Sequence, residues 1–257
     1  MPDSLGDRMK GYENAYRLYL PRRMPVIIRV DGRAFHTFTK GFQKPFDDVF
    51  AQAMREAAMM LCKEISGAKI AYVQSDEISL LVTNNDTIDT QPWFGNNLQK
   101  LASLSSSIAT LEFNNGFQIA TASYNESFAQ FTTYFRALHK ATFDARVFVL
   151  PESEVCNYFI WRQKDATRNS IQMVAQSLYS HRELQGKNCD ELQEMIFQKG
   201  INWAHYQPWQ KHGICIRKVM VDKDADNARG VWQPDYDTPV FTQDRNYIER
   251  WLIPHDA

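Results

Sequence analysis

The stretch "AKIAYVQSDEISLLVTNND" at residues 68–86 contains two short apolar runs separated by four polar residues. The runs Ile70 to Val73 and Ile78 to Val82 are rich in side chains that favour extended strands. The polar "QSDE" between them is long enough only for a tight turn, so the sequence predicts an antiparallel hairpin.

The segments on either side of this hairpin alternate between strand and helix. Residues 26–30 and "ARVFVLP" at 145–151 are predicted strands. In residues 45–65 and 98–111, apolar side chains recur at steps of three and four, which is typical of amphipathic helices. Pro45 suits the start of the first helix and Gly116 the end of the second. The order strand, helix, strand, strand, helix, strand predicts an α+β fold: a ferredoxin-like βαββαβ palm with an antiparallel sheet and its helices on one face.

The remainder of the chain reads as a mostly helical extension. Helices are predicted in "EVCNYFIWRQ", with Ser153 as the cap, in "NSIQMVAQSLYSH" and in "CDELQEMIFQK", and a strand in "ICIRKVMV". The sequence thus predicts a palm-like catalytic core over residues 1–150 and an extension over 151–257 packed on that core.

Composition narrows the class of protein. The 257 residues are 44% hydrophobic and carry a formal net charge of −1. Any contact with nucleic acid must therefore use local clusters of basic residues. Such clusters are more often ordinary solvent-exposed surface. The four cysteines lie far apart with no CxxC pair, which argues against a disulfide framework or a zinc cluster. Without a membrane-length apolar run or a signal peptide, we expect a cytoplasmic protein with no membrane partner.

Two acidic residues stand where predicted strands end. Asp31 follows the strand at 26–30, and Asp76 lies in the hairpin turn. In the predicted sheet these strands are neighbours, so the two carboxylates can face each other across one edge. Paired carboxylates suit Mg²⁺, with the carbonyl of Gly32 as a further ligand and Glu77 behind the pair. This arrangement is typical of nucleotidyl transfer assisted by two metal ions.

The residues after Asp31 suit a triphosphate. The backbone of "GRAFH" at 32–36 and the helix start near Lys44 can receive phosphate oxygens, and Arg33 and Lys40 add positive charge. His36 fits packing against neighbouring phenylalanines equally well, and Ser75 fits a purely structural turn. These residues alone predict a palm-like nucleotidyl enzyme and do not separate a polymerase from a nucleotide cyclase.

Five motifs make the prediction more specific. They are "RVDGRAFHTF" at 29–38, "KP" at 44–45, "AYVQSDEISLL" at 71–81, "FDARVFVLP" at 143–151 and "WRQKDATRNS" at 161–170. Together they resemble the tRNA-His guanylyltransferase family, over roughly residues 8–220. The resemblance implies addition of nucleotides to the 5′ end of tRNA in the 3′-to-5′ direction, after ATP or GTP activates that end. The near-neutral charge and the aromatic residues Trp203, Tyr206 and Trp209 lead us to expect a homo-oligomer that builds a basic tRNA groove from more than one subunit, and the resemblance points to a homotetramer.

The resemblance implies roles for individual residues. Asp31, Gly32 and Asp76 match the metal ligands for two Mg²⁺ ions, and the catalytic residues are Asp31, Asp76 and Glu77. The residues implied to bind the nucleotide are Gly32, Arg33, Ala34, Phe35, His36, Lys44, Ser75 and Asp76. The residues implied to contact RNA are Lys100, Arg162, Arg168 and Asn169, although an ordinary place on a helix surface explains Arg162 and Arg168 equally well.

One segment departs from the pattern of the eukaryotic enzymes. Where these carry His-Ile-Asn-Asn-Leu-Tyr-Asn, this chain has Thr167 to Met173, and only Asn169 is retained. The sequence therefore resembles the guanylyltransferase-like branch, which repairs truncated tRNA 5′ ends by copying the opposite strand. Three alternatives remain open: addition of a single guanosine to tRNA-His, a palm-type cyclase, and a catalytically silent RNA-binding module.

Overall fold

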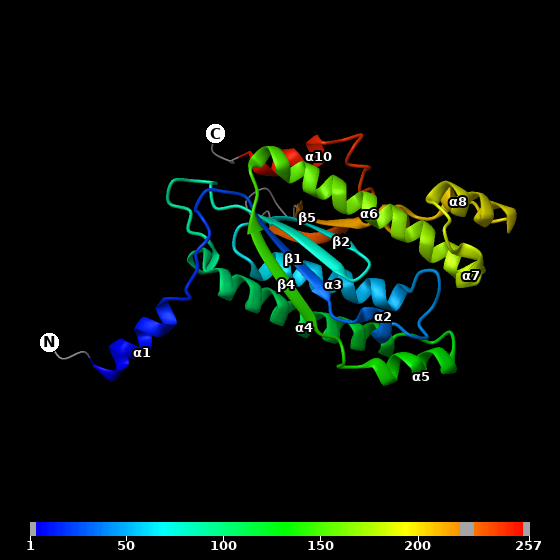
Figure 1. Cartoon of the computed structure of the whole chain (residues 1–257), viewed down its shortest axis with the longest axis horizontal. Coiled ribbons are helices and arrows are strands. Elements are labelled where there is room, and N and C mark those ends of the chain that lie inside the picture. Colours follow the sequence, from blue (N-terminus) through cyan, green and yellow to red (C-terminus); the bar gives the residue numbers. More distant parts are fainter. Residues whose placement is uncertain (1–3, 222–228, 254–257) are drawn as a thin grey trace.

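The chain folds around a single antiparallel sheet. The structure is a computed structural model that describes residues 4–221 and 229–253. Its sheet has six strands in the order β4-β1-β3-β2-β5-β6 (Figure 1). The strands are β1 (Val26–Gly32), β2 (Ala68–Gln74), β3 (Glu77–Val82), β4 (Phe143–Val149), β5 (Ile214–Val221) and β6 (Arg229–Asp235). The first four stand in the order 4-1-3-2 that the βαββαβ motif requires, so the predicted fold class is confirmed.

Helices lie on both faces of the sheet. They are α1 (Leu5–Asn14), α2 (Phe35–Phe38), α3 (Asp48–Glu64), α4 (Leu98–Ala122), α5 (Phe128–Ala137), α6 (Glu152–Leu178), α7 (His181–Leu184), α8 (Cys189–Gln198), α9 (Pro208–His212) and α10 (Asn246–Glu249). The two helices of the motif, α3 and α4, lie side by side on one face, as predicted (Figure 1). The long helix α6 crosses the opposite face, so the extension covers what would otherwise be an open side of the palm.

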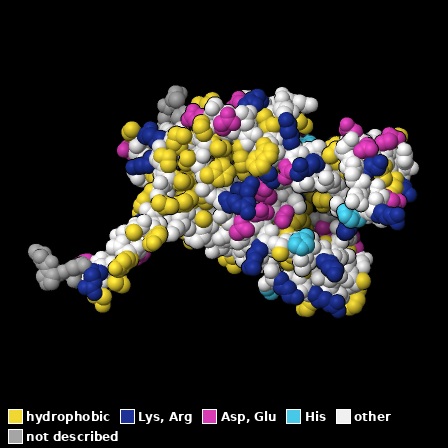
Figure 2. Space-filling model, viewed as in Figure 1, with side chains coloured by type: hydrophobic (Ala, Val, Ile, Leu, Met, Phe, Trp, Pro, Cys, Tyr) yellow, Lys and Arg dark blue, Asp and Glu magenta, His cyan; other side chains and the backbone are white. Residues whose placement is uncertain are grey.

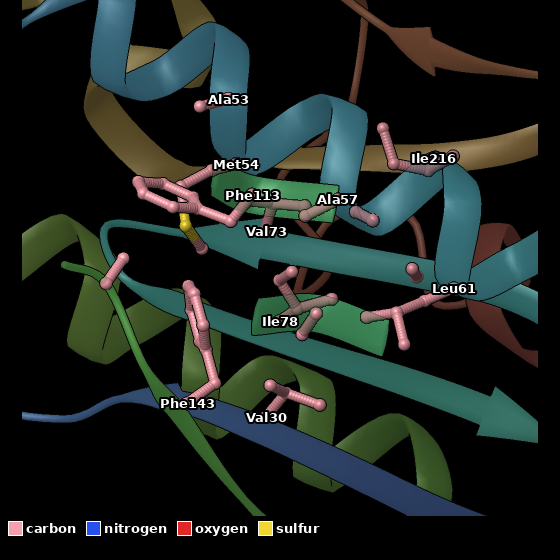
Figure 3. Packing of buried hydrophobic residues seen from close by; sticks show 14 of the residues in the cluster. Val30, Ala53, Met54, Ala57, Leu61, Val73, Ile78, Phe113, Phe143 and Ile216 are labelled. Carbon is pink, nitrogen blue, oxygen red and sulfur yellow. The ribbon is translucent and has the colours of Figure 1, made fainter. Parts of the chain in front are cut away.

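The alternation of side chains along the strands builds two separate cores. Val30 and Ile78 point toward α3 and α4, where they meet Leu61 and Phe113 (Figure 3). Ile27, one residue out of phase, packs in a different cluster beneath α6. Because both faces are covered, β1, β2 and β3 are buried along nearly their whole length, which explains their continuous apolar runs.

The predicted helix stop at Gly116 is wrong. Helix α4 continues through this residue to Ala122. A Cβ at Gly116 would lie 3.1 Å from the Cβ of Glu56 and 3.4 Å from the Cα of Ala53, both on α3. The glycine therefore allows α3 and α4 to approach closely and does not end the helix.

Other helix boundaries also differ from the prediction. Helix α6 is one continuous helix of 27 residues that begins after Pro151, so Ser153 lies inside it and caps nothing. In the polar stretch between its two apolar halves, Lys164 and Arg168 are exposed, while Arg162, Gln163 and Ala166 continue the buried stripe. Helix α3 begins after Asp47, whose side chain accepts a hydrogen bond from the amide of Phe50, and not at Pro45. Helix α5 was not predicted.

The segment after residue 150 shares the sheet with the segment before it. Strand β5 pairs with β2, and β6 pairs with β5. The boundary between a core and an extension at residue 150 stays a prediction. Within residues 4–221 and 229–253, no helix combines the length and the apolar character needed to cross a bilayer.

Candidate functional site

The carboxyl end of β1 and the β2–β3 turn meet at one edge of the sheet. The turn consists of Ser75 and Asp76, and Ser75 adopts a positive φ of 47°. The amide of Gly32 donates a hydrogen bond of 3.0 Å to the carbonyl oxygen of Asp76. Asp31 stands directly opposite Glu77 in the register. The sheet therefore brings Asp31 and Asp76 to the same edge, as the strand order predicts.

The environment of Asp76 disfavours its charged form. Burial raises the pKa of this carboxyl from its ordinary value of 3.8 to about 6, and the negative charge of Asp31 contributes to the rise. Hydrogen bonds from its own backbone and from Ser75 oppose the rise without cancelling it. A bound cation would relieve both the desolvation and the repulsion.

Three acids form a row across the sheet edge. Asp31 pairs in register with Asp144 of β4 on one side and with Glu77 of β3 on the other. Directly paired residues on neighbouring strands place their side chains on the same face. The guanidinium of Arg146 lies 3.6 Å from Asp31 and 3.9 Å from Asp144. The positive charge of Arg146 therefore offsets part of the negative charge of this row. The sequence analysis missed both Asp144 and Arg146, because only the pairing of the strands reveals them.

Glu77 is occupied by a buried arginine. Its two carboxylate oxygens accept hydrogen bonds of 2.7 Å and 2.6 Å from Arg162 of α6. Ser79 donates a third hydrogen bond, of 3.1 Å, to the same carboxylate. Both partners of the pair are less than 10% exposed, so this bidentate ion pair connects α6 to the site edge. The carboxylate of Glu77 is therefore not free to act as a further metal ligand beside Asp76.

The donor set suits a hard divalent cation. Asp31 and Asp76 offer carboxylate oxygens and Gly32 a backbone carbonyl, and Mg²⁺ is commonly held by one or two carboxylates together with water and substrate phosphate. In the part of the chain that the structure describes, no group of three or more histidine, cysteine, aspartate or glutamate side chains forms a closed metal cage. The residues present therefore fit an ion whose remaining ligands would be water and substrate phosphate.

A cleft of about 560 Å³ opens beside Asp76. A cleft of this size can hold a nucleotide. The predicted nucleotide-binding residues that line it are Phe35, His36, Lys44, Ser75 and Asp76. From α6 it is lined by Met173 and Gln176, which the sequence did not single out.

The other predicted nucleotide-binding residues lie outside this cleft. A Cβ at Gly32 would lie 2.6 Å from the Cγ of Phe35, so glycine is required where the backbone passes over that ring. Arg33 and Ala34 face a neighbouring cleft between α2 and α5. The ring of Phe35 is 3% exposed and belongs chiefly to the core.

Asp47 is a cleft residue that the sequence analysis did not select. It is buried and accepts hydrogen bonds of 2.8 Å from the amides of Gln43 and Phe50, and one of 2.7 Å from the hydroxyl of Tyr134. It thus fixes the loop that carries Lys44 against α3 and α5. The feature of the sequence that could have indicated this role was the position of Asp47 three residues after Lys44.

The predicted RNA contacts do not form one surface. Arg162 is buried in its ion pair, which corrects the expectation that it faces RNA. Arg168 is exposed and paired with Asp165. Asn169 lines a small cavity beside α9, and Lys100 lies exposed in the first turn of α4. Only Lys100 and Arg168 keep a solvent-exposed charge.

The chain matches a known family over most of the palm. Residues 6–151 match the family model described as tRNAHis guanylyltransferase. The chain is 30% identical over 233 residues to the uncharacterized protein R259 of Acanthamoeba polyphaga mimivirus, which covers 86% of this chain and 80% of that protein. It is 28% identical over 217 residues to the tRNA(His) guanylyltransferase of Debaryomyces hansenii, covering 79% and 77%.

Solved structures give the same result. A bacterial tRNA(His) guanylyltransferase-like protein in complex with ATP is 48% identical, with a TM-score of 0.84 over 97% of this chain and 99% of that one. Its complex with GTP gives a TM-score of 0.81 over the same shares of the two chains. The chain belongs to the tRNA(His) guanylyltransferase family and is a nucleotidyltransferase.

Proposed function

We propose that this enzyme adds nucleotides to the 5′ end of truncated tRNA in the 3′-to-5′ direction, copying the opposite strand of the acceptor stem. In the first step, an oxygen of the 5′ monophosphate attacks the α-phosphate of ATP or GTP, so that a nucleoside monophosphate is joined to the 5′ end and pyrophosphate leaves. In the second step, the 3′-hydroxyl of an incoming nucleoside triphosphate attacks the activated end, and the activating nucleotide leaves.

The observation that carries the proposal is that Asp76 lines a cleft of nucleotide size, with Asp31 close enough for its charge to contribute to the raised pKa of the Asp76 carboxyl. The specific branch is supported by the 48% identity to bacterial guanylyltransferase-like structures, against 28% to the enzyme from Debaryomyces hansenii. The departure of Thr167 to Met173 from the eukaryotic motif supports the same branch.

The residues of the site have different roles in the proposed reaction. Asp31, Asp76 and the carbonyl of Gly32 would hold two Mg²⁺ ions, which when bound stabilise charge on the reacting phosphate and the attacking oxygen. Lys44 and His36 are placed at the cleft to meet phosphate oxygens. Glu77 acts as a positioning residue, because it holds α6 and its cleft residue Gln176 against the edge of the sheet.

Incorporation of labelled nucleotide tests the proposal directly. The purified chain is incubated with Mg²⁺, ATP and labelled GTP. One substrate is a truncated tRNA whose missing first 5′ nucleotide would pair with cytosine. The other is a full-length tRNA-His without the additional 5′ guanosine. We expect faster incorporation on the truncated tRNA, and we expect incorporation to follow the opposing base when that base is changed.

Other outcomes would identify the alternatives. Addition of guanosine only to tRNA-His, whatever base stands opposite, would indicate the single-guanosine activity that gives the family its name. A cyclic product formed without RNA would indicate a cyclase. Absence of any Mg²⁺-dependent incorporation would leave an RNA-binding module.

The first helix supports assembly into an oligomer, which we propose to be a homotetramer. Helix α1 contains no buried residue and projects away from the sheet (Figure 1). It exposes Leu5, Met9 and Tyr12, at steps of four and three on one face. An apolar helix face without a partner in its own chain is typical of an interface. Light scattering on the full chain and on a variant with all three changed to serine would test this.

A further inference from the structure

A second cleft, of about 700 Å³, lies between α2 and α5, next to the nucleotide cleft. The two clefts share Lys40, Gly41 and Phe42, so the second continues outward from the first. We call it the basic cleft, because its lining includes four cationic side chains and no acidic one. The four are Arg33, Lys40, Arg136 and Lys140.

The four cations are free to bind a ligand. All four residues are exposed, and within the described part of the chain none of them forms an ion pair with a carboxylate. Figure 2 shows dark blue side chains gathered on the lobe that contains α2 and α5. This concentration contrasts with the net charge of −1 of the whole chain, so the positive potential is local to this region.

The walls of the basic cleft are fixed relative to each other. Gln130 of α5 donates a hydrogen bond of 3.2 Å to the carbonyl oxygen of Gly41 on the opposite wall. The amide of Arg33 donates one of 2.9 Å to the carbonyl oxygen of Thr142, just after the α5 end. The cations therefore stand on a built surface and not on a loose loop.

We propose that the basic cleft binds the sugar-phosphate backbone of the RNA substrate and directs its end toward Asp31 and Asp76. The inference rests on the proposed function, and three of the four cations, Lys40, Arg136 and Lys140, lie outside the five motifs that carry the family resemblance. Several separated cations along an open cleft match a repeating series of phosphates, while a single triphosphate is already accommodated by the nucleotide cleft.

Salt-dependent RNA binding tests the inference without turnover. The dissociation constant for truncated tRNA is measured between 50 and 200 mM salt, for the wild-type chain and for the double variant Arg136→Gln/Lys140→Gln. Each lost phosphate contact lowers the slope of log affinity against log salt by about 0.7 to 0.9. We expect the double variant to lose about 1.4 to 1.8 of this slope and about 3- to 10-fold of the affinity at the lowest salt.

Lys63→Gln is the matched control. Lys63 is exposed in the last turn of α3, a helix of 17 residues whose start lies at the nucleotide cleft. Lys63 is 13 residues beyond Phe50, the last residue of α3 in the cleft lining, and therefore lies about 20 Å along the helix from that cleft. We expect the control to keep the wild-type slope, and the double variant to keep wild-type affinity for ATP in the absence of RNA.

An unchanged slope in the double variant would overturn the proposal. A loss of ATP affinity equal to the loss of tRNA affinity would also overturn it, because the cleft would then be a nucleotide site. Failure of the proposed function gives a different result. The wild-type chain would then incorporate no nucleotide into RNA, whatever the salt dependence of RNA binding.

Discussion

Replacing Asp76 by asparagine should stabilise the metal-free protein while abolishing nucleotide transfer. Its pKa is raised from 3.8 to about 6, so above pH 6 folding forces a half-buried carboxylate to stay charged near Asp31. A rise of about two units, at about 1.4 kcal/mol per unit, corresponds to at most about 3 kcal/mol of lost stability. Asparagine has a similar shape and no charge, so the variant should recover about 1 to 3 kcal/mol at pH 8.

The pH dependence gives the sign of the effect. The folded protein takes up the proton as pH falls through 6, while the unfolded chain does so only near 3.8. The wild-type protein therefore gains stability as pH falls between these values, and the advantage of the variant should vanish by about pH 4.

Thermal unfolding in the presence of EDTA measures this difference. For a chain of this size, 1 kcal/mol corresponds to about 2 to 4 °C in Tm, so we expect the variant to melt about 2 to 12 °C higher at pH 8. Asp89→Asn removes an exposed carboxylate from a loop and should change stability by less than about 0.5 kcal/mol. A variant no more stable than wild type at pH 8, or equally favoured at pH 8 and pH 4.5, would refute the reasoning.

Three further substitutions test other contacts of the site. Arg162→Met leaves the Glu77 carboxylate buried without its partner and should lower the free energy of unfolding by about 3 to 5 kcal/mol. The double variant Arg162→Met/Glu77→Met should recover most of this loss, because no buried charge is left unpaired. Urea unfolding of both variants would measure the difference. Gly32→Ala should reduce the incorporation rate more than stability, because the added methyl group displaces the backbone carbonyl that we propose as a metal ligand. Single-turnover kinetics and thermal melting would measure the two effects. Tyr134→Phe removes the hydrogen bond to Asp47 and should cost about 1 to 3 kcal/mol in unfolding and raise the KM for ATP.

Strand order was predictable because the sequence pattern and the topology agree. The runs at 26–30 and 70–82 are apolar enough to be recognised without further information, and a βαββαβ order permits few arrangements. The errors arose where one residue type has two uses. Gly116 looks like a helix stop by composition, and only the proximity of α3 shows that it is a packing residue.

The site was partly predictable for the same reason. Asp31 and Asp76 follow apolar runs whose pairing the topology dictates, so their proximity could be inferred. Asp144 and Arg146 could not be selected, because their importance depends on the register between β4 and β1. The basic cleft combines residues about one hundred positions apart, and one of its walls is helix α5, which no periodic pattern predicted.

The position of Glu77 follows from the register and limits what this residue can do. Glu77 lies opposite Asp31 and on the same face of the sheet, which is the face that α6 covers. Releasing its carboxylate to bind a cation would leave the guanidinium of Arg162 buried without a charge partner, at a cost of several kcal/mol. Among residues 4–221 and 229–253, the other carboxylate that contacts Arg162 is that of Asp165, which already contacts Arg168 as well. If Asp31 and Asp76 hold a cation, as we propose, a third oxygen ligand would come at lower cost from the carbonyl of Gly32 or from substrate phosphate.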